Sequence, residues 1–292
     1  MITSNAASSA RSQFDVRAAV ALATRNLAEA GVPSPRSDAE ALAAHTLGVA
    51  RSTLPLTSTW EPAQQEAYED LVAERARRVP LQHLTGVAGF RHLDLAVGPG
   101  VFVPRPETEV LVSWGVDQLT DLPTPVVVDL CAGSGAIALS VALEVPGAAV
   151  YAVERESLAV AWLRRNAAGS GVHVIAGDAT DPHVLSELDG LVDLVLCNPP
   201  YIPLGAQVEP EVAEHDPPAA LWGGRTGLDV VRGVACRAQA LLRPGGQVAI
   251  EHSDRQGSAV PALLRGFPGW TEVTDHRDLA GRDRFTTARR LR

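Results

Sequence analysis

Lysine is absent from this chain of 292 residues, and all 25 basic residues are arginine. A lysine nucleophile or a lysine Schiff base is therefore excluded. Cysteine is scarce, and Cys131, Cys197 and Cys236 lie far apart without CxxC spacing. This pattern indicates reduced thiols, as in a cytosolic protein, and not a disulfide framework.

Long apolar runs are also lacking. No segment has the length of a membrane span, and Arg17, Arg25 and Glu29 interrupt the first apolar stretch, so we expect no signal peptide and a cytoplasmic location. The eight histidines show no spacing typical of metal ligands, and we expect no metal site.

A surplus of positive charge is missing from both halves of the chain. Residues 1–80 carry eight arginines against nine acidic residues, and residues 81–292 carry 17 against 25, which gives a net charge of -9. A general nucleic-acid binder presents a basic surface to the phosphate backbone, so this balance favours an acidic enzyme without a nucleic-acid groove.

The first third of the chain predicts helices. Apolar residues recur at helical spacing in 14–31, 34–50 and 61–80, with Ser or Asp near the starts and Gly or Arg near the ends. We therefore expect a small all-α domain over residues 1–80, with three to five helices. Residues 81–105 alternate and are rich in Gly and Pro, which predicts a β-hairpin linker.

Residues 106–292 predict an α/β domain. A helix is expected at about 106–120, and from residue 125 buried strands alternate with helices. The strand that ends at residue 201 is followed by a long Pro-rich loop to about 226, and a later strand is expected to begin at Gly245. Continuous apolar strands of this kind form a mostly parallel sheet with helices on both faces, here with an antiparallel strand at the C-terminal end. Ligands bind such sheets at the carboxyl ends of the strands.

The first of these strands leads into a glycine-containing turn, VVVDLCAGSG, in which Asp129 precedes Gly133 and Gly135. Glycine lets the backbone approach a ligand closely and adopt positive φ. The turn alone is weak evidence for a nucleotide site. It lacks the GK[ST] of a P-loop and the third glycine of a dinucleotide fingerprint, where Ala138 stands.

Two further strands also end at acidic residues. Glu154 follows the second strand and is placed to accept ribose hydroxyls, although a solvated helix cap explains it equally well. Asp178 follows the third strand and is placed to accept an adenine amino group. Three acidic strand ends suit a ligand with ribose, adenine and positive charge but no phosphates, and S-adenosylmethionine is such a ligand.

The fourth strand ends in LCNPPY, residues 196–201. A turn accounts for one proline, but not for two prolines between an amide and an aromatic ring. The Asn198 side-chain oxygen and the Pro199 carbonyl can accept both hydrogens of one NH2 group, while Pro200 stiffens the turn. Tyr201 can pack on the planar group that bears this NH2. We expect a planar amide or an exocyclic amine as the methyl acceptor.

The NPPY tetrapeptide after a GxG turn resembles the amino-methyltransferases that use S-adenosylmethionine. VFVPRPETE at 101–109, EPEVAEHDPPAALWGGRTGLD at 209–229 and AGRDRFTTAR at 280–289 are similar to the bacterial release-factor glutamine methyltransferases, the PrmC/HemK family. The resemblance covers nearly the whole chain and is weakest in the first 80 residues. It implies a Rossmann-like class I methyltransferase domain behind a helical domain that docks the release factor.

The resemblance also implies the reaction, which is methylation of the side-chain amide nitrogen (N5) of the glutamine in the Gly-Gly-Gln motif of peptide chain release factors. Substrate-binding residues would be Asn198 to Tyr201 together with Phe102, Pro104 and Arg105, although Arg105 could equally form an ion pair with Glu107 or Glu109. Cofactor-binding residues would be Asp129, Cys131, Ala132, Gly133, Ser134, Gly135, Glu154, Asp178, Ala179 and Asn198.

The chain departs from the family at three of these positions. Cys131-Ala132 stands where Gly-Thr is usual, Glu154 replaces an aspartate, and Ala179 is smaller than its usual counterpart. The reading that competes most directly is a DNA or RNA amino-methyltransferase, since NPPY serves a flipped base equally well. A protein that binds the cofactor or a release factor without turnover is a further alternative.

Overall fold

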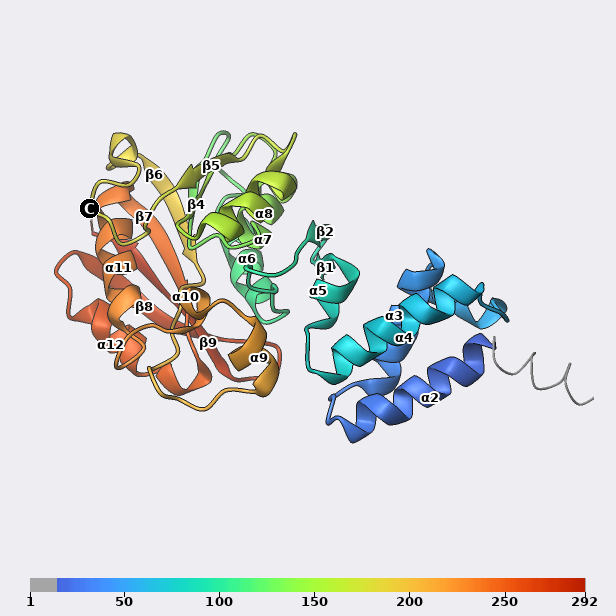
Figure 1. Ribbon diagram of the computed structural model, residues 1–292. Coiled ribbons are helices and arrows are strands. Elements are labelled where there is room, and N and C mark those ends of the chain that lie inside the picture. The colour runs from blue at the N-terminus through green and yellow to red at the C-terminus, as the bar shows by residue number, and fades with distance from the viewer. Residues whose placement is uncertain (1–14, 292) are drawn as a thin grey trace, which may run out of the picture. The chain divides into compact units, whose positions relative to one another are not determined.

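A computed structural model describes residues 15–291 (Figure 1). The chain divides into two compact units. One comprises the residues up to Gly86 together with Glu209–His215, and the other comprises Val87–Val208 and Asp216–Arg292. The segment 209–215 thus packs with the helical unit, although it lies far along the sequence in the predicted catalytic domain.

The helical unit is built from α2 (Val16–Glu29), α3 (Pro35–Leu47), α4 (Pro62–Ala76), α5 (Leu81–Thr85) and α9 (Pro210–His215), with a 3-10 turn at Arg51–Leu56. The side chain of Asp15 caps α2 by accepting from the Ala18 amide at 2.8 Å. Apolar faces meet in one core that contains Leu27, Leu42 and Tyr68. Within residues 15–80 the structure describes three α-helices, and α5 lies in the stretch that was predicted as part of the hairpin linker.

A buried arginine joins α9 to this unit. Arg75 is 4% exposed, and its guanidinium donates to Asp38 Oδ2 and to Glu211 Oε2, each at 2.8 Å. A buried charge is stable only when it is paired and hydrogen-bonded, and here two carboxylates share it. Glu211 therefore anchors the 209–215 segment to the helical unit.

A β-hairpin forms the first part of the second unit. Strands β1 (Val87–Phe90) and β2 (Leu93–Ala96) pair antiparallel, as predicted for this stretch. The Asn166 side chain holds the hairpin against α8 (Ser157–Ala167), because its amide accepts from the Ala96 N–H and donates to the Ala96 carbonyl, both at 2.9 Å. The hairpin is therefore fixed to the sheet unit.

The second unit contains a seven-stranded sheet in the order β5-β4-β3-β6-β7-β9-β8. The strands are β3 (Val126–Leu130), β4 (Ala149–Glu154), β5 (His173–Ala176), β6 (Val192–Cys197), β7 (Leu242–Glu251), β8 (Trp270–Arg277) and β9 (Asp283–Arg290). Pairs among β3 to β7 are parallel, and β9 is antiparallel to both β7 and β8. The predicted fold class is confirmed.

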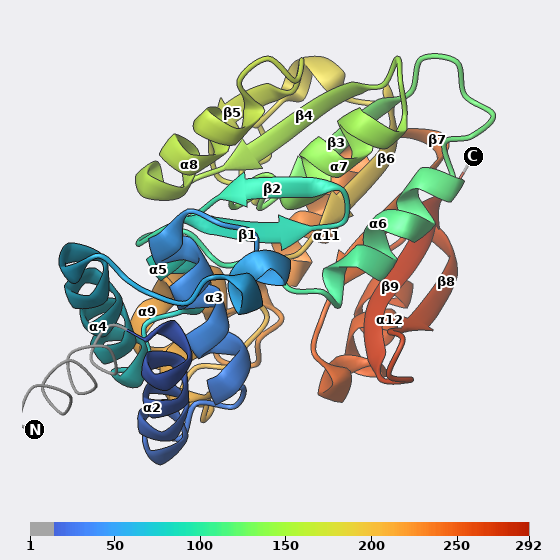
Figure 2. The same cartoon turned by 90° about the vertical axis from the view of Figure 1, so that its right-hand side faces the viewer.

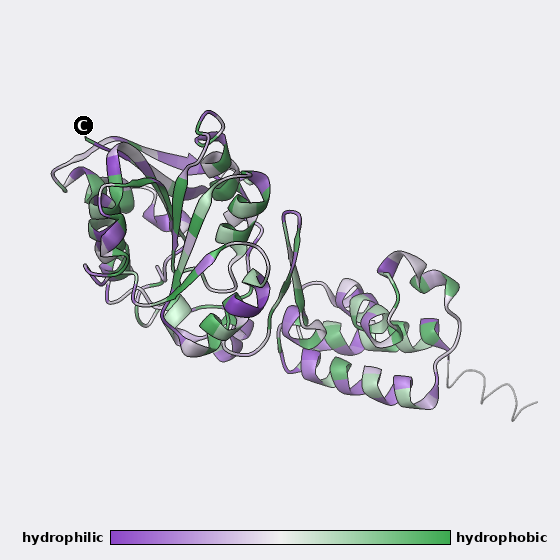
Figure 3. Ribbon diagram, turned by 90° about the horizontal axis from the view of Figure 1, so that it is seen from above, coloured by the Kyte–Doolittle hydropathy of each residue, from purple (hydrophilic) through white to green (hydrophobic). Residues whose placement is uncertain are grey.

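Helices cover both faces of this sheet (Figure 2). On one face α6 (Thr108–Asp117), α7 (Ala136–Glu144) and α8 contribute to a core with the undersides of the strands. On the other face α11 (Asp229–Leu241) and α12 (Ala259–Arg265) build a second core. Figure 3 shows the central strands mostly in the hydrophobic colour, as expected for strands buried on both sides.

Two details differ from the sequence expectations. The Pro-rich segment before residue 226, predicted as a loop, contains the short helices α9 and α10 (Pro218–Leu221). Proline fits the first turn of a helix, where no N–H partner is needed, so both can begin at Pro210 and Pro218. Strand β7 begins at Leu242, before the predicted start at Gly245. Over residues 15–291, we find no helix long and apolar enough to cross a membrane.

Candidate active site

The carboxyl ends of four neighbouring strands meet at one edge of the sheet. Parallel register pairs Leu130 of β3 with Val153 of β4 and with Cys197 of β6, and pairs Cys197 with Ile250 of β7. The residues at the ends of these strands, or directly after them, therefore gather at the same edge, where α/β proteins bind their ligands. They include Glu154, Asn198 and Glu251.

The turn after β3 has the backbone that a close ligand approach requires. Gly133 and Gly135 have φ of +56° and +91°, and Cys131 has φ of +68° although it carries a side chain. A Cβ on Gly135 would lie 2.7 Å from Leu163 Cδ1, so only glycine fits there. A Cβ on Gly133 would meet no atom within 4 Å. Open space therefore lies beside this backbone.

Glu154 supports that turn. Its Oε2 accepts from the Gly133 amide at 2.9 Å, and its Oε1 accepts from the amides of Arg155 and Glu156 at 2.8 and 2.9 Å. These amides precede α8, whose N-cap position is Glu156 and which no side chain caps, so the helix-cap interpretation of Glu154 is wrong. The carboxylate joins the end of β4 to the glycine turn after β3, and its contact with a ribose stays a prediction.

Asp129 lies below the turn with an exposed fraction of 0%. Its Oδ2 accepts from the Ala138 amide at 3.1 Å in the first turn of α7. Burial raises the pKa of this carboxyl well above its ordinary value. Asp129 therefore fixes the start of α7, and its direct contact with a cofactor stays a prediction.

Of the remaining predicted cofactor residues, Ala132, Ser134 and Ala179 are buried within the turns. Asp178 Oδ1 accepts from the Thr180 amide at 2.8 Å and from its hydroxyl at 2.7 Å. Partial burial raises the pKa of Asp178, but these bonds and the charge of Arg155 outweigh it, so the net shift is downward. Asp178 is thus an ionised acceptor at the end of β5.

Asn198 directly follows β6, and its Nδ2 donates to Thr108 Oγ1 at 3.2 Å. Pro199 and Pro200 are buried, whereas Asn198 and Tyr201 are partly exposed. The Tyr201 hydroxyl donates to Glu251 Oε1 at 3.5 Å. Asn198 is therefore held through its nitrogen, and the acceptor role of its side-chain oxygen stays a prediction.

Thr108 and Glu251 were not among the predicted site residues. Thr108 lies 90 positions before Asn198, and Glu251 lies 50 positions after Tyr201. An available signal for Glu251 was its place at the end of a strand next to β6. The exposed fraction of Glu251 is 1%, and burial raises its pKa to about 7.

Residues that follow the NPPY turn hold it in place. The Ile202 amide donates to the Leu221 carbonyl and the Gly223 amide to the Ile202 carbonyl, both at 2.9 Å. The Tyr201 carbonyl accepts from Gln256 Nε2 at 3.1 Å. A Cβ on Gly227 would lie 2.2 Å from that Tyr201 carbonyl oxygen. The conformation of the NPPY turn is thus set by glycines about 25 residues further on.

Of the two alternatives given for Arg105, the ion pair with Glu107 or Glu109 is wrong. Arg105 pairs with neither Glu107 nor Glu109 but with Asp216 Oδ2 at 2.8 Å, and its guanidinium lies 4.7 Å from the ring centroid of Phe102. Asp216 is 4% exposed, so it attracts the guanidinium more strongly than solvated glutamates do. Phe102, Pro104 and Arg105 are partly exposed.

These residues fit S-adenosylmethionine. The glycine turn offers open space beside its backbone, and Glu154 and Asp178 provide carboxylate acceptors. The negative charge of these two carboxylates disfavours a bound phosphate, but it does not disfavour a sulfonium, a ribose or an adenine. The assignment of individual contacts stays a prediction. Within the described residues, no group of three or more His, Cys, Asp or Glu side chains is arranged to hold a metal ion.

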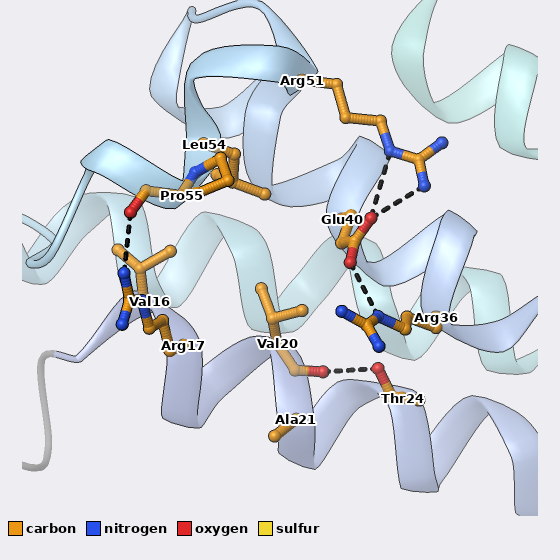
Figure 4. Close-up of a pocket in the computed structure, with 10 residues that line it drawn as sticks. All are labelled: Val16, Arg17, Val20, Ala21, Thr24, Arg36, Glu40, Arg51, Leu54 and Pro55. Atoms are coloured by element: carbon orange, nitrogen blue, oxygen red, sulfur yellow. Dashed lines mark hydrogen bonds and ion pairs between the residues drawn. The ribbon is translucent and has the colours of Figure 1, made fainter.

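The helical unit has a pocket of its own, of about 540 Å³, between α2, α3 and the 3-10 turn (Figure 4). Val16, Val20 and Leu54 contribute apolar surface. The charged residues that line it are Arg17, Arg36, Arg51 and Glu40. Glu40 pairs with both Arg36 and Arg51, so the pocket keeps a surplus of positive charge.

Two family profiles match the chain. The PrmC N-terminal domain matches residues 18–86, and the methyltransferase small domain matches residues 106–215. A methyltransferase from Thermus thermophilus that acts on 16S rRNA, solved with AdoMet and guanosine, has a similar fold. Its TM-score is 0.50 with 22% sequence identity, over 70% of this chain and 50% of that chain.

Relatives with higher identity span nearly the whole chain. The release factor glutamine methyltransferase of Mycolicibacterium smegmatis is 51% identical over 94% of this chain and 98% of its own length. That of Streptomyces coelicolor is 52% identical over 94% of this chain and 97% of its own length. With the NPPY turn and the glycine turn at one sheet edge, these matches show that the chain belongs to the release factor glutamine methyltransferase family.

Proposed function

We propose that this protein transfers a methyl group from S-adenosylmethionine to the side-chain amide nitrogen (N5) of the glutamine in the Gly-Gly-Gln motif of peptide chain release factors. The observation that carries the proposal is Asn198. This residue directly follows β6, beside the glycine turn, and its side-chain nitrogen donates a hydrogen bond to the Thr108 hydroxyl oxygen. Membership in the release factor glutamine methyltransferase family supports the choice of substrate.

The chain's own residues act mainly by orientation. An amide nitrogen is a poor nucleophile, because its lone pair is delocalised. The Asn198 side-chain oxygen and the Pro199 carbonyl would accept its two hydrogens and hold the nitrogen in line with the methyl carbon. When bound, S-adenosylmethionine supplies an electrophilic methyl group on a sulfonium. Fixed orientation of this kind can supply roughly 7–11 kcal/mol in favourable cases.

Charge balance is simple in this mechanism. The bound cofactor would supply the methyl group and would keep the electron pair that this group leaves behind. Positive charge develops on the nitrogen, which strengthens both hydrogen bonds to the two acceptor oxygens. The nitrogen would then lose one proton to solvent and become the neutral N-methylated amide.

Replacement of Asn198 tests the proposal. We expect Asn198→Ala to lower kcat about 100-fold for methyl transfer to a purified release factor, since one aimed dipole is lost. Radiolabelled cofactor measures the rate, and a release factor whose Gly-Gly-Gln glutamine is replaced should accept no label. The matched control is Glu272→Gln, whose side chain is 64% exposed on β8. Near wild-type transfer by Asn198→Ala would contradict the mechanism.

The acidic balance of residues 81–292, with 17 arginines against 25 acidic residues, favours a protein substrate over a nucleic acid. We expect a filter-binding assay to retain neither duplex nor single-stranded nucleic acid at physiological salt. Because release factors act in translation, the proposal places the protein in the cytoplasm.

The helical unit would dock the release factor. Its pocket joins apolar side chains to a rim with a surplus of arginine, which suits an apolar segment flanked by acidic residues. The family profile of this unit supports a role of its own, separate from methyl transfer.

A further inference from the structure

One side chain of α8 forms hydrogen bonds with both the glycine turn and the β-hairpin. Asn166 Nδ2 donates to the Ser134 carbonyl in the glycine turn and to the Ala96 carbonyl at the end of β2, each at 2.9 Å. Asn166 Oδ1 accepts from the Ala96 amide, also at 2.9 Å. Because a carbonyl oxygen can only accept, these three bonds use both hydrogens of the NH2 and fix which end of the amide faces each partner.

The hairpin leads directly into the predicted substrate residues. Residues 97–105 form neither a helix nor a strand, and burial alternates along them. Val101 and Val103 are buried and belong to a small apolar cluster with Ala159 of α8, whereas Phe102 between them is partly exposed. The backbone that carries Phe102 is therefore held by α8, and the Phe102 ring is open to solvent.

Two larger side chains of α8 lie against the same segment. Trp162 Nε1 donates to the Pro99 carbonyl at 3.3 Å, and a Cβ on Gly98 would lie 2.5 Å from the Trp162 ring. A Cβ on Gly100 would lie 2.6 Å from Leu158 Cδ1. The start of the 97–105 segment thus packs so closely on α8 that a side chain at either glycine would displace it.

The same helix also contacts the glycine turn. Leu163 lies beside Gly135, where a Cβ would approach it to 2.7 Å. Helix α8 is therefore a rigid element between the turn predicted to bind the cofactor and the segment predicted to bind the substrate. Asn166 is the side chain of α8 whose single NH2 group serves carbonyls on both sides.

We propose that Asn166 is a positioning residue, which aligns the bound cofactor with the substrate amide by fixing the glycine turn and the start of the 97–105 segment to each other. The inference rests on the function proposed above. Because one NH2 serves both carbonyls, a shift of either carbonyl weakens the hydrogen bond to the other. A ligand that orders the turn therefore lowers the cost of ordering the segment, and the two ligands bind cooperatively.

The test is the affinity for a peptide with the Gly-Gly-Gln loop, measured by calorimetry with and without saturating S-adenosylhomocysteine, the cofactor without its methyl group. For the wild type, we expect S-adenosylhomocysteine to raise the peptide affinity about tenfold, and the peptide to raise the affinity for S-adenosylhomocysteine by the same factor. For Asn166→Asp, both factors should fall below about twofold, because a carboxylate cannot donate to either carbonyl.

Turnover gives a second measurement. We expect Asn166→Asp to lower kcat about 10- to 100-fold, because a displacement of about 1 Å is costly in an oriented site. Asn166→Ala, which places no charge beside the two carbonyls, should lose kcat and cooperativity in the same way. The matched control is Gln239→Glu on α11, which loses an amide hydrogen bond to the Pro268 carbonyl of 2.9 Å and should keep the wild-type kcat and cooperativity.

Cooperativity of equal size in the wild type and in both Asn166 variants overturns the inference, as does a wild type whose two ligands bind independently. Losses in Gln239→Glu as large as those in Asn166→Asp also overturn it, because they would follow from reduced stability and not from alignment. A wild type that transfers no methyl group to a release factor overturns the proposed function instead.

Discussion

At the scale of single residues, the raised pKa of Glu251 links the stability of the fold to pH. Its ordinary pKa of 4.5 becomes about 7 in the folded state. The folded state therefore holds this proton more tightly than the unfolded state does. The contribution is fully present below pH 4.5 and is lost as the pH rises through 7.

We predict that Glu251→Gln removes this loss. Relative to the variant, the wild type should lose roughly 3 kcal/mol of unfolding free energy between pH 4.5 and pH 7.5. Denaturant titrations across this range measure the difference. Burial raises the pKa of Asp129 as well, but Asp129 is present in both proteins and cancels. The raised pKa of Glu251 would be refuted if the difference in unfolding free energy between wild type and Glu251→Gln varied with pH no more than that between wild type and Glu272→Gln.

Sequence reasoning predicted Asn198 as a site residue, because a turn does not account for all four residues of NPPY. It did not identify Glu251, because a glutamate at the end of a strand is common and its burial depends on β9 and α6. It named the wrong partners for Arg105 for the same reason, since Asp216 lies 111 positions away.

At the scale of elements, the NPPY turn depends on the segment that follows it. Gly227 has φ of +77°, and its α-carbon faces the Tyr201 carbonyl so closely that a Cβ would lie 2.2 Å from the oxygen. Gln256 Nε2, which bonds that carbonyl, would lie 2.9 Å from the same Cβ. An alanine at this position must therefore displace the backbone of the turn.

We predict that Gly227→Ala lowers kcat by about 10- to 100-fold, because a displacement of about 1 Å in the acceptors is costly in an oriented site. Cofactor affinity should change little, since the glycine turn after β3 is separate. Calorimetry and transfer assays measure the two effects. The matched control is Gly205→Ala in the same loop, with φ of +83° and no atom within 4 Å of its Cβ.

The two glycine variants share the strain of a positive φ but differ in the contact with Tyr201. An equal loss of kcat in both variants would attribute the effect to backbone strain and not to the contact of Gly227 with the Tyr201 carbonyl.

Sequence periodicity predicted the strands and helices of this unit well, because each is buried in a regular pattern. It did not predict α9 and α10, since helices this short contain little more than one turn of pattern.

At the scale of the whole molecule, local sequence patterns did not predict with which unit residues 209–215 pack. Their position between β6 and α11 predicted a loop of the catalytic domain. Instead Arg75 draws Glu211 into the helical unit with a hydrogen bond of 2.8 Å. Such a pairing follows from burial of a guanidinium that needs two carboxylates, which no local window reveals.

The proposed docking role of the helical unit has a test that separates it from catalysis. Arg17 lines the pocket on α2, and its guanidinium donates to the Pro55 carbonyl at 2.9 Å. Arg17→Glu replaces this positive charge with a negative one beside the apolar floor. We predict that KM for the full-length release factor rises about tenfold, equivalent to about 1.4 kcal/mol, while kcat stays unchanged.

The matched control is Arg25→Glu, an equal change of charge at an exposed position of the same helix outside the pocket lining. A short peptide with the Gly-Gly-Gln loop provides the second comparison, since it cannot reach a docking surface and should be methylated equally by all three proteins. Because exposed charges are screened, the wild-type KM for the release factor should also rise with salt. If Arg25→Glu raises KM as much as Arg17→Glu does, the net charge of the unit attracts the release factor and the pocket does not bind it.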